Sequence, residues 1–316
     1  MCLCGFIKFH VNLFAMTALK SPPHQDDVFT ILHPEDDMAA PLLMDSPHSG
    51  RIYPEDFVTL CPHSLLQSSE DRFVDFLVRD GVLHGATVLM AEFPRTYIDL
   101  NRAEDDIEDD IIADPENLPI ERAPTIKAEN GIGLIRRLAR SNYAMYDHAL
   151  SADDIIHRIT HYYRPYHSIL GNEIARLHKQ FGRVLYLDMH SMPNDLAPPV
   201  KQNGLMNIIH PKRVDFVIGD LDGTSCDLTL RNEIISFIKK SGYTVALNKP
   251  FKGWELIRRH SHPSNNINAL QIEINRSLYL EKGDRDWKDN GGLELKGFIE
   301  RLTQHCINLV HRNIRA

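Results

Sequence analysis

Apolar and polar positions along the chain follow two patterns, one typical of buried strands and one of amphipathic helices. Short runs of Val, Leu, Ile and Met that end in Pro, Gly or a polar loop predict buried strands. These runs lie within residues 42–50, 85–93, 183–193, 215–227, 243–254 and 268–280. The last strand leads out into a loop, and so do several of the others, which places polar side chains where strands end.

Segments with a 3.6-residue period separate the strands. Residues 68–82 combine serines, early acids and an apolar stripe, which predicts the start of a helix. Residues 151–182 predict a long helix that is perturbed near Pro165 and ended by Gly182. Further helices are predicted within residues 228–242 and 293–316. This alternation predicts an α/β fold: a mostly parallel, twisted sheet with helices on both faces, which binds ligands beyond the carboxyl ends of its strands.

We predict a poorly structured N-terminal extension over residues 1–40 and a single α/β domain over residues 41–316. The first sixteen residues are apolar, but Lys8 and His10 interrupt them and no cleavage site follows, so neither a signal peptide nor a membrane span is predicted. A start of translation at Met16 is the alternative we favour. Residues 104–132 are rich in acids and prolines and predict an excursion over the surface.

Charge and cysteine content narrow the function classes. The 35 basic and 43 acidic residues give a formal charge of −8, so nucleic acid is not an expected partner. The odd number of cysteines, without distant CxxC pairs, predicts reduced thiols and a cytoplasmic protein. The cysteines are Cys2, Cys4, Cys61, Cys226 and Cys306.

Histidines and acids stand at the predicted strand ends. Two apolar strands end in a His-Ser pair with a proline nearby, and these pairs supply His48 and His190. Two neutral imidazoles are natural zinc ligands, and a catalytic zinc site has three protein ligands and a water. The third ligand should be a carboxylate or a histidine, and the nearest acids are Glu70, Asp71 and Asp75. Asp220 and Asp222 also follow a strand.

Glu273 lies within the apolar stretch "LQIEIN". A glutamate there either faces solvent on an amphipathic strand or is buried for a purpose, because burial without a cation is costly. Beside a zinc site it would be the base that takes a proton from water and passes it to the leaving nitrogen.

The stretch "FPRTYIDLNR" supplies groups that could bind an anion. A guanidinium presents a fork that matches a carboxylate, and a neighbouring asparagine adds donors, so Asn101 and Arg102 are candidates for substrate binding. Arg95 and Arg276 could help to hold an anionic substrate or stabilise an oxyanion. Each arginine alone could equally form a surface ion pair.

Taken together, these stretches resemble the N-formylglutamate amidohydrolases, a family similar to zinc carboxypeptidases, with a phosphorylase/hydrolase-like α/β fold. The resemblance covers roughly residues 42–282. The matching stretches, in order, are "SPHSG", "EDRFVDFL", "RTYIDLNR", "YRPYH", "LDMHSMP", "GDLDGTSCD", "NKPFKGW" and "ALQIEINRSLY".

The resemblance implies His48 and His190 as zinc ligands, Glu273 as the catalytic carboxylate, and Asn101-Arg102 as the grip on a substrate carboxylate. The carboxypeptidase pattern has a glutamate three residues after the first histidine, where this chain has Arg51. We therefore choose Asp71 as the third ligand, with Glu70 and Asp75 in reserve. The basic stretch "IRRHSHP" follows "KGW" where the family usually has a glycine-rich loop. This difference concerns the identity of the substrate and not the type of reaction.

The expected function is zinc-dependent hydrolysis of the N-formyl amide of an acidic amino acid, N-formyl-L-glutamate to formate and L-glutamate, as in histidine catabolism. The expected cofactor is Zn²⁺, and the expected partner is a small anionic amino acid rather than nucleic acid or a membrane. Alternatives are a carboxypeptidase-like or other N-acyl amidohydrolase activity, a cell-wall amidase and a non-catalytic binding module. A serine hydrolase that uses Ser191 or Ser225 is a further alternative, but it is not favoured because neither serine lies in a GxSxG motif.

Overall fold

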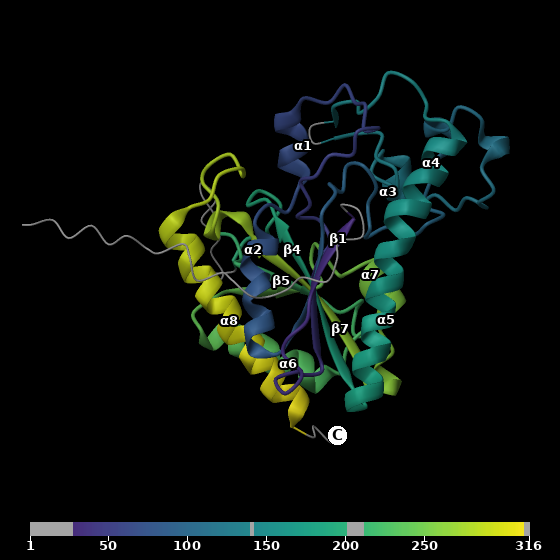
Figure 1. The fold of residues 1–316 in the computed structure, drawn as a ribbon. Coiled ribbons are helices and arrows are strands. Elements are labelled where there is room, and N and C mark those ends of the chain that lie inside the picture. Colours follow the sequence, from purple (N-terminus) through teal and green to yellow (C-terminus); the bar gives the residue numbers. More distant parts are fainter. Residues whose placement is uncertain (1–27, 140–141, 201–211, 313–316) are drawn as a thin grey trace, which may run out of the picture.

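The computed structural model describes residues 28–139, 142–200 and 212–312. These residues form a fold built around a seven-stranded sheet (Figure 1). Its order is β1-β3-β2-β4-β7-β5-β6. The strands are β1 (Phe29–Leu32), β2 (Leu42–Ser46), β3 (Thr87–Ala91), β4 (Val184–Met192), β5 (Phe216–Gly219), β6 (Val245–Leu247) and β7 (Ile267–Asn275).

The four central strands, β3, β2, β4 and β7, are parallel, which confirms the predicted mostly parallel sheet. β5 pairs antiparallel with β7, and β6 runs parallel to β5. The carboxyl end of β5 therefore lies at the opposite end of the sheet from those of β2, β4 and β7.

β1 corrects part of the prediction of a poorly structured N-terminal extension over residues 1–40. Phe29–Leu32 pairs antiparallel with β3 and buries three of its four side chains. An unpaired β3 edge would expose a row of backbone donors and acceptors, so the added strand protects it. Residues 1–27, with Cys2, Cys4 and the expected start at Met16, lie outside the described residues.

Helices cover both faces of the sheet, as predicted. α2, α6 and α8 lie on one face, and α5 and α7 lie on the other (Figure 1). The α-helices are α1 (His63–Ser69), α2 (Val74–Val78), α3 (Ile126–Glu129), α4 (Ala152–Arg158), α5 (Arg164–Phe181), α6 (Leu228–Lys240), α7 (Glu255–His260) and α8 (Asp289–His311). Short 3-10 helices span Arg79–His84, Asp109–Ile111, Pro115–Asn117, Pro263–Asn265 and Arg276–Leu278.

Strand side chains of opposite faces enter two separate cores. Leu43, Leu89 and Tyr186 pack against the α5 side, whereas Met44 and Leu187 pack against α2 and α8. Because both faces are buried, the strands read as continuous apolar runs, and the polar residues within them stand out.

The predicted helix at 151–182 is present, and its perturbation has a defined form. Ser151 caps α4 in a capping box, and a π-helical turn, Ile159–Tyr163, joins α4 to α5 directly before Pro165. Gly182 ends α5 with a φ of 71°, a conformation that glycine adopts at little cost.

The predicted helix at 68–82 begins later than its serine cap suggested. α1 ends at Ser69, and α2 begins at Val74 and buries Val74, Leu77 and Val78. The backbone N–H of Asp71 donates to His48 O at 2.9 Å, which holds the intervening residues outside both helices.

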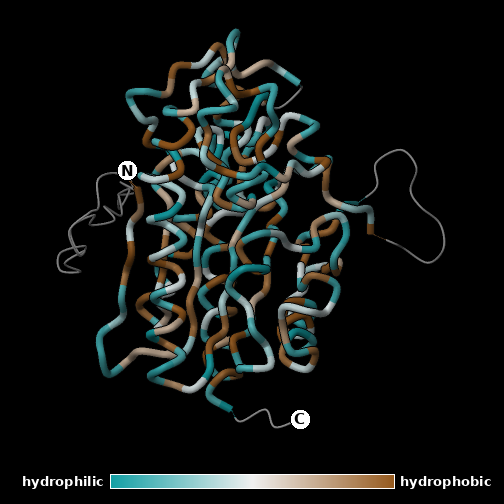
Figure 2. The backbone as a smooth tube through the Cα atoms, turned by 90° about the vertical axis from the view of Figure 1, so that its right-hand side faces the viewer, coloured by the Kyte–Doolittle hydropathy of each residue, from teal (hydrophilic) through white to brown (hydrophobic). Residues whose placement is uncertain are grey.

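Residues 51–69, 104–139 and 142–150, here called the cap, lie together above the strands in Figure 1, and the rotated view of Figure 2 shows the same layer at the top. The cap follows the carboxyl ends of β2 and β3 and has its own buried residues, including Ile107, Ile111 and Leu134. The predicted surface excursion is thus a packed layer over the carboxyl ends of the central strands. No helix in the described ranges is long and apolar enough to cross a membrane.

Candidate active site and metal centre

Three ligand-type side chains meet at the carboxyl ends of β2 and β4. His48 follows β2, His190 is the seventh residue of β4, and Asp71 lies between α1 and α2. One ligand atom from each lies within 4.8 Å of the others, and all three side chains are buried. Asp71 Oδ2 is 3.1 Å from His190 Nδ1 and 3.6 Å from His48 Nδ1.

Local backbone packing brings the loop after β2 close to Asp71. A Cβ on Gly50 would lie 2.2 Å from Phe93 O, so only glycine lets the chain pass there. Ser49 Oγ donates to Asp71 O at 2.8 Å. The "HSG" stretch therefore fixes the relative positions of two of the three ligand-type residues.

Each histidine has a carboxylate on its other ring nitrogen. His48 Nε2 is 2.8 Å from Asp99 Oδ1, and His190 Nε2 is 2.7 Å from Asp188 Oδ1. With the proton on Nε2, the Nδ1 lone pair of each ring is directed toward Asp71. His48 Nδ1 is buried and lacks a hydrogen-bond partner among the described residues. Two imidazoles oriented by carboxylates and one aspartate fit a catalytic zinc site.

The charges around the three residues also suit a divalent cation. Burial opposes ionisation of Asp71, but the adjacent imidazoles of His190 and His48 and the charge of Arg276 hold its pKa well below the usual value. Burial lowers the pKa of His48. Burial acts the same way on His190, yet Asp188 and Asp71 raise its pKa well above the usual value. A cation bound here would replace the proton of His190.

Glu273 stands beside this cluster on β7, directly across from His190 in the β4–β7 register. It is 7% exposed, and burial raises its pKa to about 7. Gln271 Nε2 donates to Glu273 Oε1 at 2.9 Å, and Asn101 Nδ2 donates to Gln271 Oε1 at 3.1 Å. A carboxylate that gains and loses a proton near neutrality is suited to general acid–base work.

The four predicted anion-binding residues all line one cavity of about 460 Å³ together with His48, Asp71, His190 and Glu273. Arg95 pairs through Nη2 with Asp99 Oδ2 at 2.8 Å. Arg102 donates to Ile132 O at 2.9 Å and to Asn101 O at 2.6 Å.

Arg276, which was predicted to hold an anionic substrate or stabilise an oxyanion, lines the cavity but has several partners within the protein. Its guanidinium donates to Asp71 Oδ1 at 2.9 Å, to the backbone carbonyls of Ser68 and Glu70, and to Ser191 Oγ. These contacts occupy most of its donors, so the geometry favours orientation of Asp71 over contact with a substrate.

The other candidate acids lie outside the cluster. Glu70 accepts hydrogen bonds from Tyr53 and Arg72. Asp75 is 2.5 Å from Arg51 Nη2. Asp220 binds Arg231 and Asn248 beyond the antiparallel β5, and Asp222 binds Lys252. Of these five acids, the structure brings only Asp71 to the histidines.

The remaining sequence candidates have other contacts. Ser225 Oγ donates to Ala269 O, and Ser191 Oγ accepts from Arg276. Within the described ranges, no hydrogen bond joins either hydroxyl to a histidine. Arg258 and Arg259 of the basic "IRRHSHP" stretch pair with Glu255 on α7, and they do not line the cavity. His260 stacks on His167.

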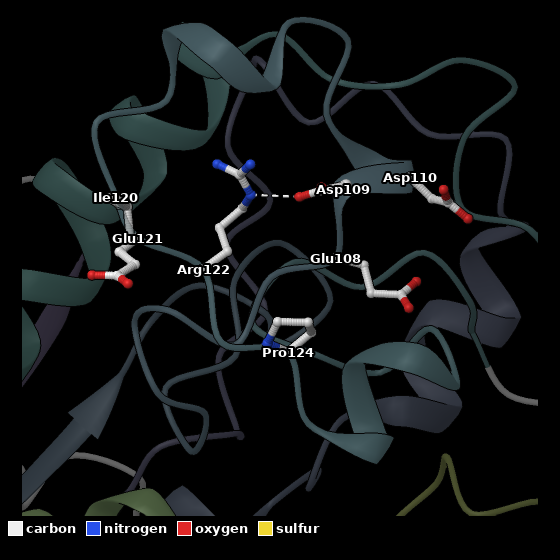
Figure 3. A pocket seen from close by; sticks show the side chains of 7 residues that line it. All are labelled: Glu108, Asp109, Asp110, Ile120, Glu121, Arg122 and Pro124. Atoms are coloured by element: carbon white, nitrogen blue, oxygen red, sulfur yellow. Dashed lines mark hydrogen bonds and ion pairs between the residues drawn. The ribbon is translucent and has the colours of Figure 1, made fainter.

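A second cavity, of about 490 Å³, lies on the cap and has none of the predicted site residues in its lining (Figure 3). Its lining is mostly acidic, but Arg122 pairs with Asp109 and Arg137 pairs with Glu108 and Asp110. These carboxylates already have cationic partners.

Sequence reasoning missed Asp188, Gln271, Lys127 and Arg136, and it assigned no role to Asp99. Asp188 is a lone acid in an apolar strand, so the criterion that selected Glu273 would also have selected it. Asp99 lies in the stretch "RTYIDLNR", but nothing in that sequence indicates its contact with His48. Lys127 and Arg136 belong to the cap and line the main cavity.

A buried His-Asp-His cluster beside a glutamate that is not part of it, at the carboxyl ends of parallel strands, is typical of metal-dependent hydrolases. The sequence profile of the N-formylglutamate amidohydrolase family matches residues 40–280. The chain belongs to this family of amide hydrolases, as its motifs predicted.

Individual relatives support this assignment to the family. The chain is 37% identical to the N-formylglutamate amidohydrolase of Ralstonia eutropha JMP134, with a TM-score of 0.82 over 91% of this chain and 100% of that structure. It is 29% identical to an N-formylglutamate deformylase of Pseudomonas putida over 63% of this chain and 66% of the relative, just under two thirds. The deformylase of Pseudomonas aeruginosa is 26% identical over 77% of this chain and 83% of that protein.

Proposed function

We propose that this chain is a zinc-dependent hydrolase that converts N-formyl-L-glutamate to formate and L-glutamate. The observation that carries the proposal is the position of Glu273, buried beside the His48-Asp71-His190 cluster in a cavity lined with arginines. The names of the relatives supply the substrate, and the cationic lining suits an acid.

The two histidines and Asp71 would hold a zinc ion, which would supply Lewis-acid polarisation of a carbonyl group and would acidify water. Glu273 takes the proton of the attacking water and delivers it to the amide nitrogen as the C–N bond breaks. Asp99, Asp188 and Arg276 hold the ligands in orientation. Arg95, close to the cluster, stabilises developing negative charge on the formyl oxygen.

Formate release from a panel of N-formyl and N-acetyl amino acids tests this proposal. We expect N-formyl-L-glutamate to be the preferred substrate, a chelator to abolish its hydrolysis, and added Zn²⁺ to restore it. Equal turnover with and without chelator would contradict the metal, and preference for a C-terminal peptide bond would favour the carboxypeptidase-like alternative. Freshly purified protein with neither zinc nor hydrolytic activity would favour the binding module, which near-stoichiometric zinc would exclude. A cytoplasmic location stays a prediction.

Arg102 and Asn101 are proposed to hold the α-carboxylate of the substrate. Replacing Arg102 with alanine should raise KM by about 10- to 100-fold, because a charge-assisted pair is lost, and should leave bound zinc unchanged. Steady-state kinetics and metal analysis measure the two effects. Arg137→Ala, on the cap but paired with Glu108 outside this cavity, is the control and should behave like the wild type. An unaffected KM in Arg102→Ala would contradict the assignment.

A further inference from the structure

Cationic side chains from three different segments line the part of the cavity under the cap. Arg95 and Arg102 flank the loop after β3, Lys127 lies on α3, and Arg136 lies in the cap. Four cations facing one cavity repel one another unless anions balance them. The question is therefore which of them have an anionic partner within the protein.

Two carboxylates form ion pairs with three of the four cations. Asp99 Oδ2 accepts from Arg95 at 2.8 Å and from Arg136 at 3.0 Å, and Asp99 Oδ1 is taken by His48. Asp106 Oδ2 is 4.0 Å from Arg102 Nε. Both carboxylates are fully buried, so their negative charges act on the four cations and are not exposed to solvent. Four positive charges against two negative ones leave an excess of two.

Lys127 has no carboxylate partner among the described residues, and Arg136 Nε is buried without a hydrogen-bond partner there. Lys127 Nζ lies 5.1 Å from the ring centre of Trp254. This cation–π contact partly replaces the hydration that the ammonium group loses on burial. Burial and the charge of Arg102 lower the pKa of Lys127 to about 8. An anion at this place would reverse that shift.

The backbone of the cap fixes Lys127 in this position. Asp106 Oδ1 accepts from the Thr125 N–H at 2.7 Å, and Lys127 O accepts from the Ile132 N–H at 2.9 Å. A Cβ on Gly133 would lie 2.8 Å from Ala128 Cβ, so α3 packs directly on the following chain. The lysine is thus placed by a rigid support, as a binding residue requires.

We infer that Lys127 and Arg136 bind the second, side-chain carboxylate of a dicarboxylic N-acyl amino acid. The inference rests on the proposed function and deepens it. An N-acylated dicarboxylic acid is a dianion, and its charge equals the excess of the cation cluster. The principal charges acting on Lys127 are Arg102, Arg95, Asp99 and Arg136, none of which is a proposed metal ligand. Lys127 lies on α3 in the cap and Glu273 lies on β7, so a substrate in the cavity that both residues line could place its amide at Glu273 and its side-chain carboxylate at Lys127.

Comparing N-formyl-L-glutamate with its neutral-side-chain analogue N-formyl-L-glutamine tests the inference. Lys127→Met should lower kcat/KM for the glutamate substrate by about 10- to 100-fold and for the glutamine substrate by less than about 3-fold. Lys252→Met is the matched control: Lys252 lines the same cavity but pairs with Asp222 at 3.0 Å, so its loss should spare both substrates. Equal losses on both substrates in Lys127→Met, or no loss, would overturn the inference.

Calorimetry with glutarate and glutaramate separates this inference from the proposed function. The wild type should bind the dianion glutarate about 10-fold more tightly than glutaramate, and Lys127→Met should reduce that preference to less than about 3-fold. If the wild type hydrolyses neither formyl substrate but shows this preference, the subsite stands and the proposed function fails. Equal affinity for the two acids in the wild type, or a preference that survives in Lys127→Met, would overturn the subsite.

Discussion

Replacing Glu273 with glutamine is expected to lower kcat by about 10³-fold or more and to leave zinc bound. The substitution keeps the shape of the side chain but removes the group that accepts the proton of water, and general acid–base catalysis alone contributes about 10²- to 10⁴-fold. Glu273 is not one of the three clustered ligand-type residues, so the metal content should not change. Formate release gives kcat, and metal analysis of the purified variant gives the zinc content.

Glu70→Gln is the control for this variant. Glu70 is also buried, but Tyr53 and Arg72 hold its carboxylate outside the cavity, so kcat should stay within a few-fold of the wild type in any Glu70→Gln enzyme that folds. A matching urea-unfolding midpoint would exclude a general loss of structure in Glu273→Gln. Loss of zinc from Glu273→Gln would show that it is a ligand and that the base is another residue.

The sequence predicts the centre of the fold well because the four parallel strands are buried on both faces. Their apolar runs end abruptly, so His48 and His190 could be assigned to strand ends from the sequence alone. β1 was not predicted as a strand, and the orientation of β5 could not be predicted, since a short apolar run is compatible with either direction of pairing. That ambiguity placed Asp220 at the wrong end of the sheet.

The site was less predictable wherever a residue acts through a contact between distant segments. Asp99 is separated from His48 by 51 positions, and Arg276 from Asp71 by 205. No local pattern encodes such pairs. Lys127 belongs to the acidic, proline-rich stretch 104–132, whose composition is that of a solvated loop, and Arg136 follows shortly after it. Only its packing over the strand ends turns its few cations toward the cavity.

Asp71 is the ligand that sequence reasoning left least determined, because Glu70 and Asp75 are close in the chain. Asp71→Asn is expected to weaken zinc affinity by about 10²-fold or more and to lower activity in proportion to the zinc lost. The amide keeps the size of the side chain, but it is a far weaker ligand than a carboxylate for a cation also held by two neutral imidazoles. Competition with a chromogenic chelator measures the affinity.

Asp75→Asn is the matched control, four positions away on α2. Its carboxylate pairs with Arg51 and lies outside the cavity, so zinc affinity should stay within about 3-fold of the wild type. Asp71→Asn also loses the ion pair with the buried Arg276, which is expected to lower the free energy of unfolding of the metal-free protein by a few kcal/mol. Urea unfolding in excess chelator separates that effect from metal binding. Unchanged zinc affinity in Asp71→Asn together with a large loss in Asp75→Asn would reverse the assignment and move the metal toward α2.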